Sequence, residues 1–189
     1  MIKSYSDYQY YLERDRIARG MPDNVKRPRF GRDVVWRWQR TLRTLEYIHN
    51  CKKGPFWSFI RLALTIKFRM DSVKLGFTIP INTFDEGLYI PHYGTIVVHG
   101  TARIGKNCRL MEGTNIGDSA GRTPIIGDNC FICTGAKILG GVRIGNNVIV
   151  GANAVVIKSV DEDDVTVGGV PAKIISHKNS AAYINERLR

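Results

Sequence analysis

The sequence predicts a mainly β protein whose chain winds into a parallel β-helix, with a helical leader before it and a short C-terminal helix after it. From residue 126 to residue 156, Ile or Val recurs at every sixth position, and small or branched residues recur four positions later. Neither an α-helix nor a single strand has such a period. If three short faces close one coil, residues about 18 positions apart stack and bury one another.

The same period extends towards the N-terminus with one interruption. Stepping back by six from Ile116 gives Leu110, Ile104 and Val98, but the step from Ile116 to Ile126 is ten. Four extra residues must therefore leave the coil as a loop between Asp118 and Pro124. A solenoid tolerates such a loop, and loops on a rigid scaffold often carry function.

We divide the chain into a basic helical leader (1–75), a β-helix (76–175) and a C-terminal helix or tail (176–189). Helices are expected at 4–20 and 32–50, the second with one side formed by Trp38, Leu42 and Leu45 and with Arg37, Arg40 and Arg43 elsewhere.

A third helix is expected at 55–72, with Pro55 in its first turn. Apolar residues surround a polar stripe, which consists of Ser58, Arg61, Thr65 and Arg69. Such a helix either packs on its own domain or a sister subunit, or lies on a membrane surface.

Charge is concentrated in the leader. Residues 1–76 hold 17 Lys and Arg against 7 Asp and Glu, which is +10 of the total net charge of +11. This basic region is either a solvated face or a face for anionic lipid or glycan; no nucleic-acid motif accompanies it, so no nucleic-acid partner is expected. The sequence shows no transmembrane run and no secretion signal, which predicts a cytoplasmic protein, at most in peripheral contact with the anionic inner face of the membrane.

Cys130 and Cys133 have the spacing of a redox or zinc pair, but no second pair completes a metal site. Cys130 and, one coil earlier, Cys108 fall on the small inward position of the repeat. We therefore expect these cysteines to serve as packing residues of the core and to bind no metal ion.

Four stretches carry a family resemblance: residues 90–98 (IPHYGTIVV), 101–105 (TARIG), 135–140 (GAKILG) and 168–173 (GGVPAK). Because of these stretches, the region from about 76 to 175 resembles the hexapeptide-repeat acyltransferases, in particular the serine O-acetyltransferase group. The resemblance implies a left-handed parallel β-helix, acetyl-CoA as the acyl donor, and a homotrimer with each active site between neighbouring β-helices.

His92 stands where this family places its catalytic His, and a neutral imidazole suits the general base that such acyl transfer needs. Two positions depart from the serine enzymes: Pro91 replaces an Asp, and Thr123 replaces a second His in the loop. These departures favour an O-acetyltransferase that acts on a hydroxyl of a sugar or polysaccharide precursor. The alternatives are a serine O-acetyltransferase of cysteine biosynthesis and a non-catalytic scaffold.

The remaining candidate site residues divide by role. Arg122 can clamp an anion or donate to a substrate oxygen, and His99 and Glu112 are the other candidate substrate-binding residues. For the donor, Thr134 and Ala152 occupy equivalent positions 18 residues apart and should leave a shallow groove for the pantetheine arm. Lys173 stands where the family meets the CoA phosphates.

Overall fold

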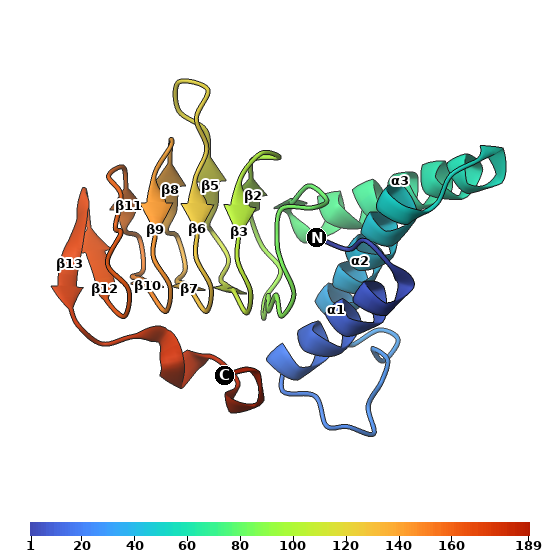
Figure 1. Ribbon diagram of the computed structural model, residues 1–189, viewed down its shortest axis with the longest axis horizontal. Coiled ribbons are helices and arrows are strands. Elements are labelled where there is room, and N and C mark those ends of the chain that lie inside the picture. The colour runs from blue at the N-terminus through green and yellow to red at the C-terminus, as the bar shows by residue number, and fades with distance from the viewer.

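The computed structural model describes residues 1–189 and confirms the predicted fold class: a left-handed parallel β-helix that follows a helical leader (Figure 1). The leader contains α1 (Tyr5–Ala18), α2 (Val34–Cys51) and α3 (Pro55–Leu75). Ser4 caps α1 by accepting a hydrogen bond from the Asp7 amide, and Gly76 ends α3 in the left-handed conformation.

The β-helix has three faces, which we number in the order used below. The first face contains β1 (Phe77–Thr78), β2 (Ile96–Val98), β5 (Asn115–Gly117), β8 (Lys137–Leu139) and β11 (Val155–Val156). The second face contains β4 (Arg109–Leu110), β7 (Phe131–Ile132), β10 (Ile149–Val150), β12 (Thr166–Gly169) and β13 (Ala172–Ser176). The third face contains β3 (Arg103–Ile104), β6 (Ile125–Ile126) and β9 (Arg143–Ile144).

Strand register confirms the repeat that the sequence predicts. On the second face, Ile132 pairs with Leu110 on one side and Val150 on the other, all in parallel, and all three are fully buried. From Ile132 to Val150 the chain advances 18 residues, whereas from Leu110 to Ile132 it advances 22. The four extra residues leave the coil as the predicted loop, which rises beyond β5 in Figure 1.

The corner between the third and second faces is held by a ladder of asparagines. Asn107, Asn129 and Asn147 all have a positive φ, which Asn tolerates better than most residues. The side-chain amide of Asn107 donates to Asn129 at 2.8 Å, and that of Asn129 donates to Asn147 at 2.9 Å. Each coil therefore supplies the hydrogen-bond acceptor for the asparagine side chain of the coil before it.

Two of the four cysteines lie inside the β-helix, as the repeat predicts. Cys108 and Cys130 are completely buried, and desolvation raises the pKa of the Cys130 thiol to about 12. Cys133 is half-buried on the outer side. The cysteines at 108 and 130 are packing residues.

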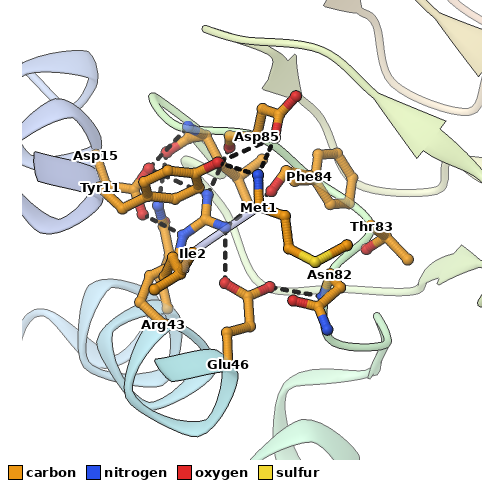
Figure 2. A network of polar contacts seen from close by, with 12 residues as sticks. Met1, Ile2, Tyr11, Asp15, Arg43, Glu46, Asn82, Thr83, Phe84 and Asp85 are labelled. Atoms are coloured by element: carbon orange, nitrogen blue, oxygen red, sulfur yellow. Dashed lines mark hydrogen bonds and ion pairs between the residues drawn. The ribbon is translucent and has the colours of Figure 1, made fainter. Parts of the chain in front are cut away.

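A buried ionic network joins the leader to the first coil (Figure 2). Arg43 of α2 was expected outside the apolar side of its helix, but its side chain is completely buried. Its guanidinium donates to Asp15 at 2.9 Å, to Glu46 at 3.0 Å and to the carbonyl oxygens of Phe84 and Asp85 at 2.9 and 2.7 Å. Helical periodicity does not reveal this role, because Asp15, Phe84 and Asp85 are distant from Arg43 in the sequence.

Asp15 and Glu46 extend this network into the β-helix backbone. One oxygen of Asp15 accepts hydrogen bonds from the amides of Gly87 and Leu88, each at 2.9 Å, and Glu46 accepts from the amide of Asn82 at 2.7 Å. The two carboxylates therefore accept hydrogen bonds from backbone amides of an irregular segment that forms no strand of its own.

The predicted C-terminal helix is wrong. β13 pairs antiparallel with β12, and only two 3₁₀ turns follow, η1 (Ser180–Tyr183) and η2 (Glu186–Leu188). The tail runs back beside the coils to α1 (Figure 1), where Asn185 donates to the carbonyl of Ile17 at 2.8 Å. A segment this short gains more from such contacts than from helical hydrogen bonds of its own.

Candidate active site

His92 lies at the corner between the second and first faces, which we call the His92 edge. It follows Tyr89, which bridges to Arg109 of the second face, and precedes β2 of the first face. Its side chain is exposed. At Gly94, whose φ is 140°, an added Cβ would lie only 3.1 Å from the Cβ of Glu112 in the next coil. A glycine at this turn therefore lets the His92 turn pack closely on Glu112.

Glu112 is the nearest carboxylate along this edge. Its Oε1 accepts a hydrogen bond from the Thr134 hydroxyl at 2.9 Å, and its buried Oε2 accepts none. The pKa of the Glu112 carboxyl is lowered, chiefly by hydrogen bonds from its own backbone amide and from the Thr134 hydroxyl. Desolvation acts in the opposite direction, and positive charge on His92 lowers the pKa further. The edge thus presents an ionised carboxylate beside the candidate base.

The candidate donor-binding residues continue along the same edge. Thr134 and Ala152 are both exposed, and the Asn153 amide donates to the Thr134 carbonyl at 2.9 Å, so the two turns stack as predicted. Lys173 pairs in register with Gly168, at the far end of the edge. With coils about 4.8 Å apart, this edge offers a long shallow track that leads towards His92.

Arg122 and His99 lie at another corner, between the first and third faces, which we call the loop edge. The ring nitrogen Nδ1 of His99 lies 3.0 Å from the Thr101 hydroxyl, which lies 3.1 Å from the Thr123 hydroxyl. Arg122 is exposed and lines a groove of about 410 Å³ beneath the loop, together with Lys158.

Within one chain the structure therefore separates the predicted site into two sets. His92, Glu112, Thr134, Ala152 and Lys173 share the His92 edge, whereas Arg122 and His99 share the loop edge, with the first face between them. The sequence reasoning missed Thr101, which links His99 to Thr123, and the Glu112–Thr134 hydrogen bond. The Thr101–Thr123 and Glu112–Thr134 contacts share a spacing of 22 residues, which is one coil plus the loop, and this spacing was their only signal in the sequence.

No group of three or more His, Cys, Asp or Glu side chains lies close enough together to hold a metal ion. Thiol, imidazole and carboxylate side chains are instead distributed along the coils.

The sequence of this chain is similar to a known family model and to named enzymes. The family model described as bacterial transferase hexapeptide (six repeats) matches residues 123–158, which include Thr134 and Ala152. The serine acetyltransferase of Staphylococcus xylosus is 41% identical over 117 residues, covering 54% of each chain. That of Synechococcus elongatus is 36% identical over 94 residues, covering 48% of this chain and 38% of the relative. The chain thus spans about half the length, or less, of these curated relatives.

Solved structures extend the likeness to the leader. Serine acetyltransferase from Brucella abortus strain S19 superimposes with a TM-score of 0.72 at 27% identity, covering 93% of this chain and 72% of that chain. The same enzyme in complex with coenzyme A gives a TM-score of 0.69 at 26% identity, covering 93% of this chain and 70% of that chain.

These relatives correct one prediction. The sugar or polysaccharide acceptor is wrong, because the similar proteins and structures described above are all named serine acetyltransferase. The prediction gave decisive weight to Pro91 and Thr123. Two substitutions are a weaker guide to the acceptor than similarity over a hundred or so residues, and the alternative acceptor, L-serine, fits these relatives better. The comparisons confirm the resemblance of this chain to the hexapeptide-repeat acyltransferases and, within them, to the serine acetyltransferase-like group.

Proposed function

We propose that this chain is an O-acetyltransferase that transfers the acetyl group of acetyl-CoA to the hydroxyl of L-serine. The observation that carries the proposal is the His92 edge, which lines up an exposed imidazole, a carboxylate and small turn residues on a hexapeptide-repeat scaffold. The acceptor rests on the similarity to serine acetyltransferases.

His92 acts as the general base. Its imidazole takes the proton of the serine hydroxyl while the oxygen attacks the thioester carbonyl. The tetrahedral intermediate then collapses, the carbon–sulfur bond breaks, and the imidazolium returns the proton to the departing thiolate. The products are O-acetylserine and CoA, and His92 ends in its starting state.

Glu112 supports the imidazolium that forms during this reaction. Pro91 offers no carboxylate next to His92, but the Glu112 side chain lies in the adjacent coil at the same corner. Thr134 holds one of its oxygens, and the other is free of hydrogen bonds. Glu112 is thus a positioning residue that supplies, from the next coil, the negative charge that residue 91 lacks.

Donor binding uses the remainder of the edge. The exposed turn at Thr134 and Ala152 leaves room for an extended pantetheine arm, whose amides pair with turn backbone groups. Lys173 supplies a positive charge for the phosphates at the far end. The thioester of a donor bound this way lies at the His92 end.

We infer further that the active form is a homotrimer of parallel β-helices. The loop edge, with Arg122 and His99, lies away from His92 in one chain. In a closed threefold arrangement, the loop edge of one copy faces the His92 edge of its neighbour. Arg122 then binds the carboxylate of serine beside His92 of the adjacent copy.

The central test is thiol release from acetyl-CoA in the presence of L-serine. We expect His92→Ala to lower kcat by about 10²- to 10⁴-fold, whereas His49→Ala, which alters another exposed histidine, keeps the wild-type rate. Equal rates for wild type and His92→Ala would overturn the assignment of the base. Turnover only with other hydroxyl acceptors would overturn L-serine as the substrate.

Two further comparisons separate the roles within the site. Glu112→Gln keeps the hydrogen bond from Thr134 but removes the charge, so we expect kcat to fall while KM for acetyl-CoA stays unchanged. Mixing inactive His92→Ala with inactive Arg122→Ala should restore activity through heterotrimers. Failure of this mixture to recover any activity would place both residues in one chain's site or exclude the trimer.

A further inference from the structure

The outer side of α3 carries a continuous row of uncovered apolar side chains. Phe59 is 72% exposed and Val73 is 82% exposed, which is unusual for such large apolar groups. The row consists of Phe56, Phe59, Leu62, Ile66, Met70 and Val73. At about 3.6 residues per turn, this spacing of three or four puts all six side chains on one side of the helix.

The opposite side of α3 makes the contacts that hold it to the protein. Phe68 and Ser72 are buried against α2, where the Trp38 indole donates to the Ser72 hydroxyl at 2.8 Å and stacks on the Phe68 ring. The apolar row is therefore not needed to fix α3 in place.

The predicted polar stripe of α3 lies between these two sides. Ser58, Arg61, Thr65 and Arg69 line a cleft of about 580 Å³ that α2 and the segment at Pro80 complete. The expected polar stripe therefore borders the protein's own cleft, while apolar groups cover the outermost side.

Positive charges flank the apolar row. Lys67 and Lys74 project on one margin and Arg69 on the other, all exposed, and Lys53 precedes the helix. The one acidic residue of α3, Asp71, is already paired with Lys67. Lys53, Arg69 and Lys74 have no acidic partner, so the row combines apolar anchors with a rim of net positive charge.

We propose that this face of α3 docks the protein on an anionic membrane surface, with the helix axis in the plane of the interface. Phe, Leu, Ile and Met side chains enter the boundary between headgroups and acyl chains, and the lysines and arginines pair with anionic headgroups. No helix of the protein has the length and apolarity to cross a bilayer, and the docking described here requires no crossing.

The charge pattern favours a lipid surface over a second copy of the same face. Two such faces packed against each other would bring their basic margins together, with Asp71 as the only acid on each helix. An anionic lipid surface instead supplies the opposite charge along both margins.

The position of the face also suits a flat surface. The α2–α3 hairpin projects beyond the coils, at the end of the molecule opposite β12 and β13 (Figure 1). Docking through α3 therefore leaves both the His92 edge and the loop edge of the β-helix free for substrates.

The experiment measures co-flotation of the full-length protein with vesicles, so it does not depend on the proposed acetyl transfer. Vesicles contain phosphatidylcholine alone, or phosphatidylcholine with roughly one third phosphatidylglycerol. We expect binding to the phosphatidylglycerol vesicles that weakens as salt is raised, and little binding to phosphatidylcholine alone.

The decisive comparison uses the same substitution at two exposed phenylalanines. Phe59→Glu should weaken binding roughly tenfold or more, because it places a negative charge in the apolar row. Phe30→Glu changes a phenylalanine that is 93% exposed outside α3 and should leave binding close to wild type. For the basic rim, Lys74→Glu should weaken binding, whereas Lys178→Glu on the C-terminal tail should not.

Three results would overturn the proposal. The first is absence of flotation, and the second is an equal loss with Phe59→Glu and Phe30→Glu. The third is that Phe59→Glu reduces the oligomer size without lipid and leaves flotation unchanged, which would make the face a contact between copies. Circular dichroism of each variant confirms that the fold is retained.

Discussion

The β-helix and the helical leader are stabilised by different means. In the β-helix, each inward position repeats one kind of residue, so that Leu110, Ile132 and Val150 bury one another in successive coils. In the leader, a completely buried arginine and two acids pair with one another and hydrogen-bond to the backbone of the first coil. The first arrangement depends on a repeat along the chain, and the second on contacts between residues that are far apart in the sequence.

The two regions also differ in the functions proposed for them. The leader holds nearly all of the net positive charge and the uncovered apolar row of α3. The β-helix is close to neutral and holds the exposed His92 beside Glu112. The two proposed functions therefore use different parts of the molecule.

The largest effect is expected from a substitution that breaks the connection between the leader and the β-helix. Arg43→Met removes the cation that satisfies Asp15 and Glu46, and it should lower the free energy of unfolding by about 3–5 kcal/mol. Urea denaturation measures the loss. Arg32→Met, at an exposed position, serves as the control and should change little. Near-equal stability of the two variants would mean that the buried network does not hold the leader in place.

A smaller effect is expected within the β-helix. Ile138→Ala empties part of a completely buried position and should cost about 2–5 kcal/mol. Ile125→Ala, at an outward position of β6 that is half exposed, should stay within about 0.5 kcal/mol of wild type. The same urea titration compares them, and a similar loss at both positions would contradict the inward and outward assignment.

The smallest effect concerns acid stability at the end of the β-helix. The amide of Asn146 donates to Asp163 at 2.6 Å, and this hydrogen bond, with a second from the Asn146 side chain, lowers the pKa of the Asp163 carboxyl. A lowered pKa in the folded state stabilises the fold above the unfolded value of about 3.9, and this contribution is lost as the pH falls further.

Asp163→Asn removes this titration but retains an acceptor oxygen. We therefore expect its thermal midpoint to fall less steeply than that of wild type as the pH is lowered below about 4. Asp161→Asn, which changes an exposed neighbour, should follow the wild-type curve. Parallel curves for wild type and Asp163→Asn would show that this carboxyl does not contribute.

The sequence by itself determined the β-helix, its loop at 118–124, the inward placement of Cys108 and Cys130, and the stacking of Thr134 on Ala152. All of these follow from a period of six, because a repeated coil makes distant residues neighbours at a known spacing. The three leader helices were also predicted to within a few residues of their ends, since local signals such as Pro55 in the first turn of α3 mark helix boundaries.

Only the tertiary structure decided the burial of Arg43, the return of the C-terminal tail to α1, and the uncovered side of α3. It also decided that His92 and Arg122 lie on different edges of one chain. These features depend on contacts between segments that share no repeat, such as Asp15 with Gly87 or Asn185 with Ile17. Periodicity specifies which side chains of an element lie together, but which partner covers them is decided only when separate parts of the chain pack.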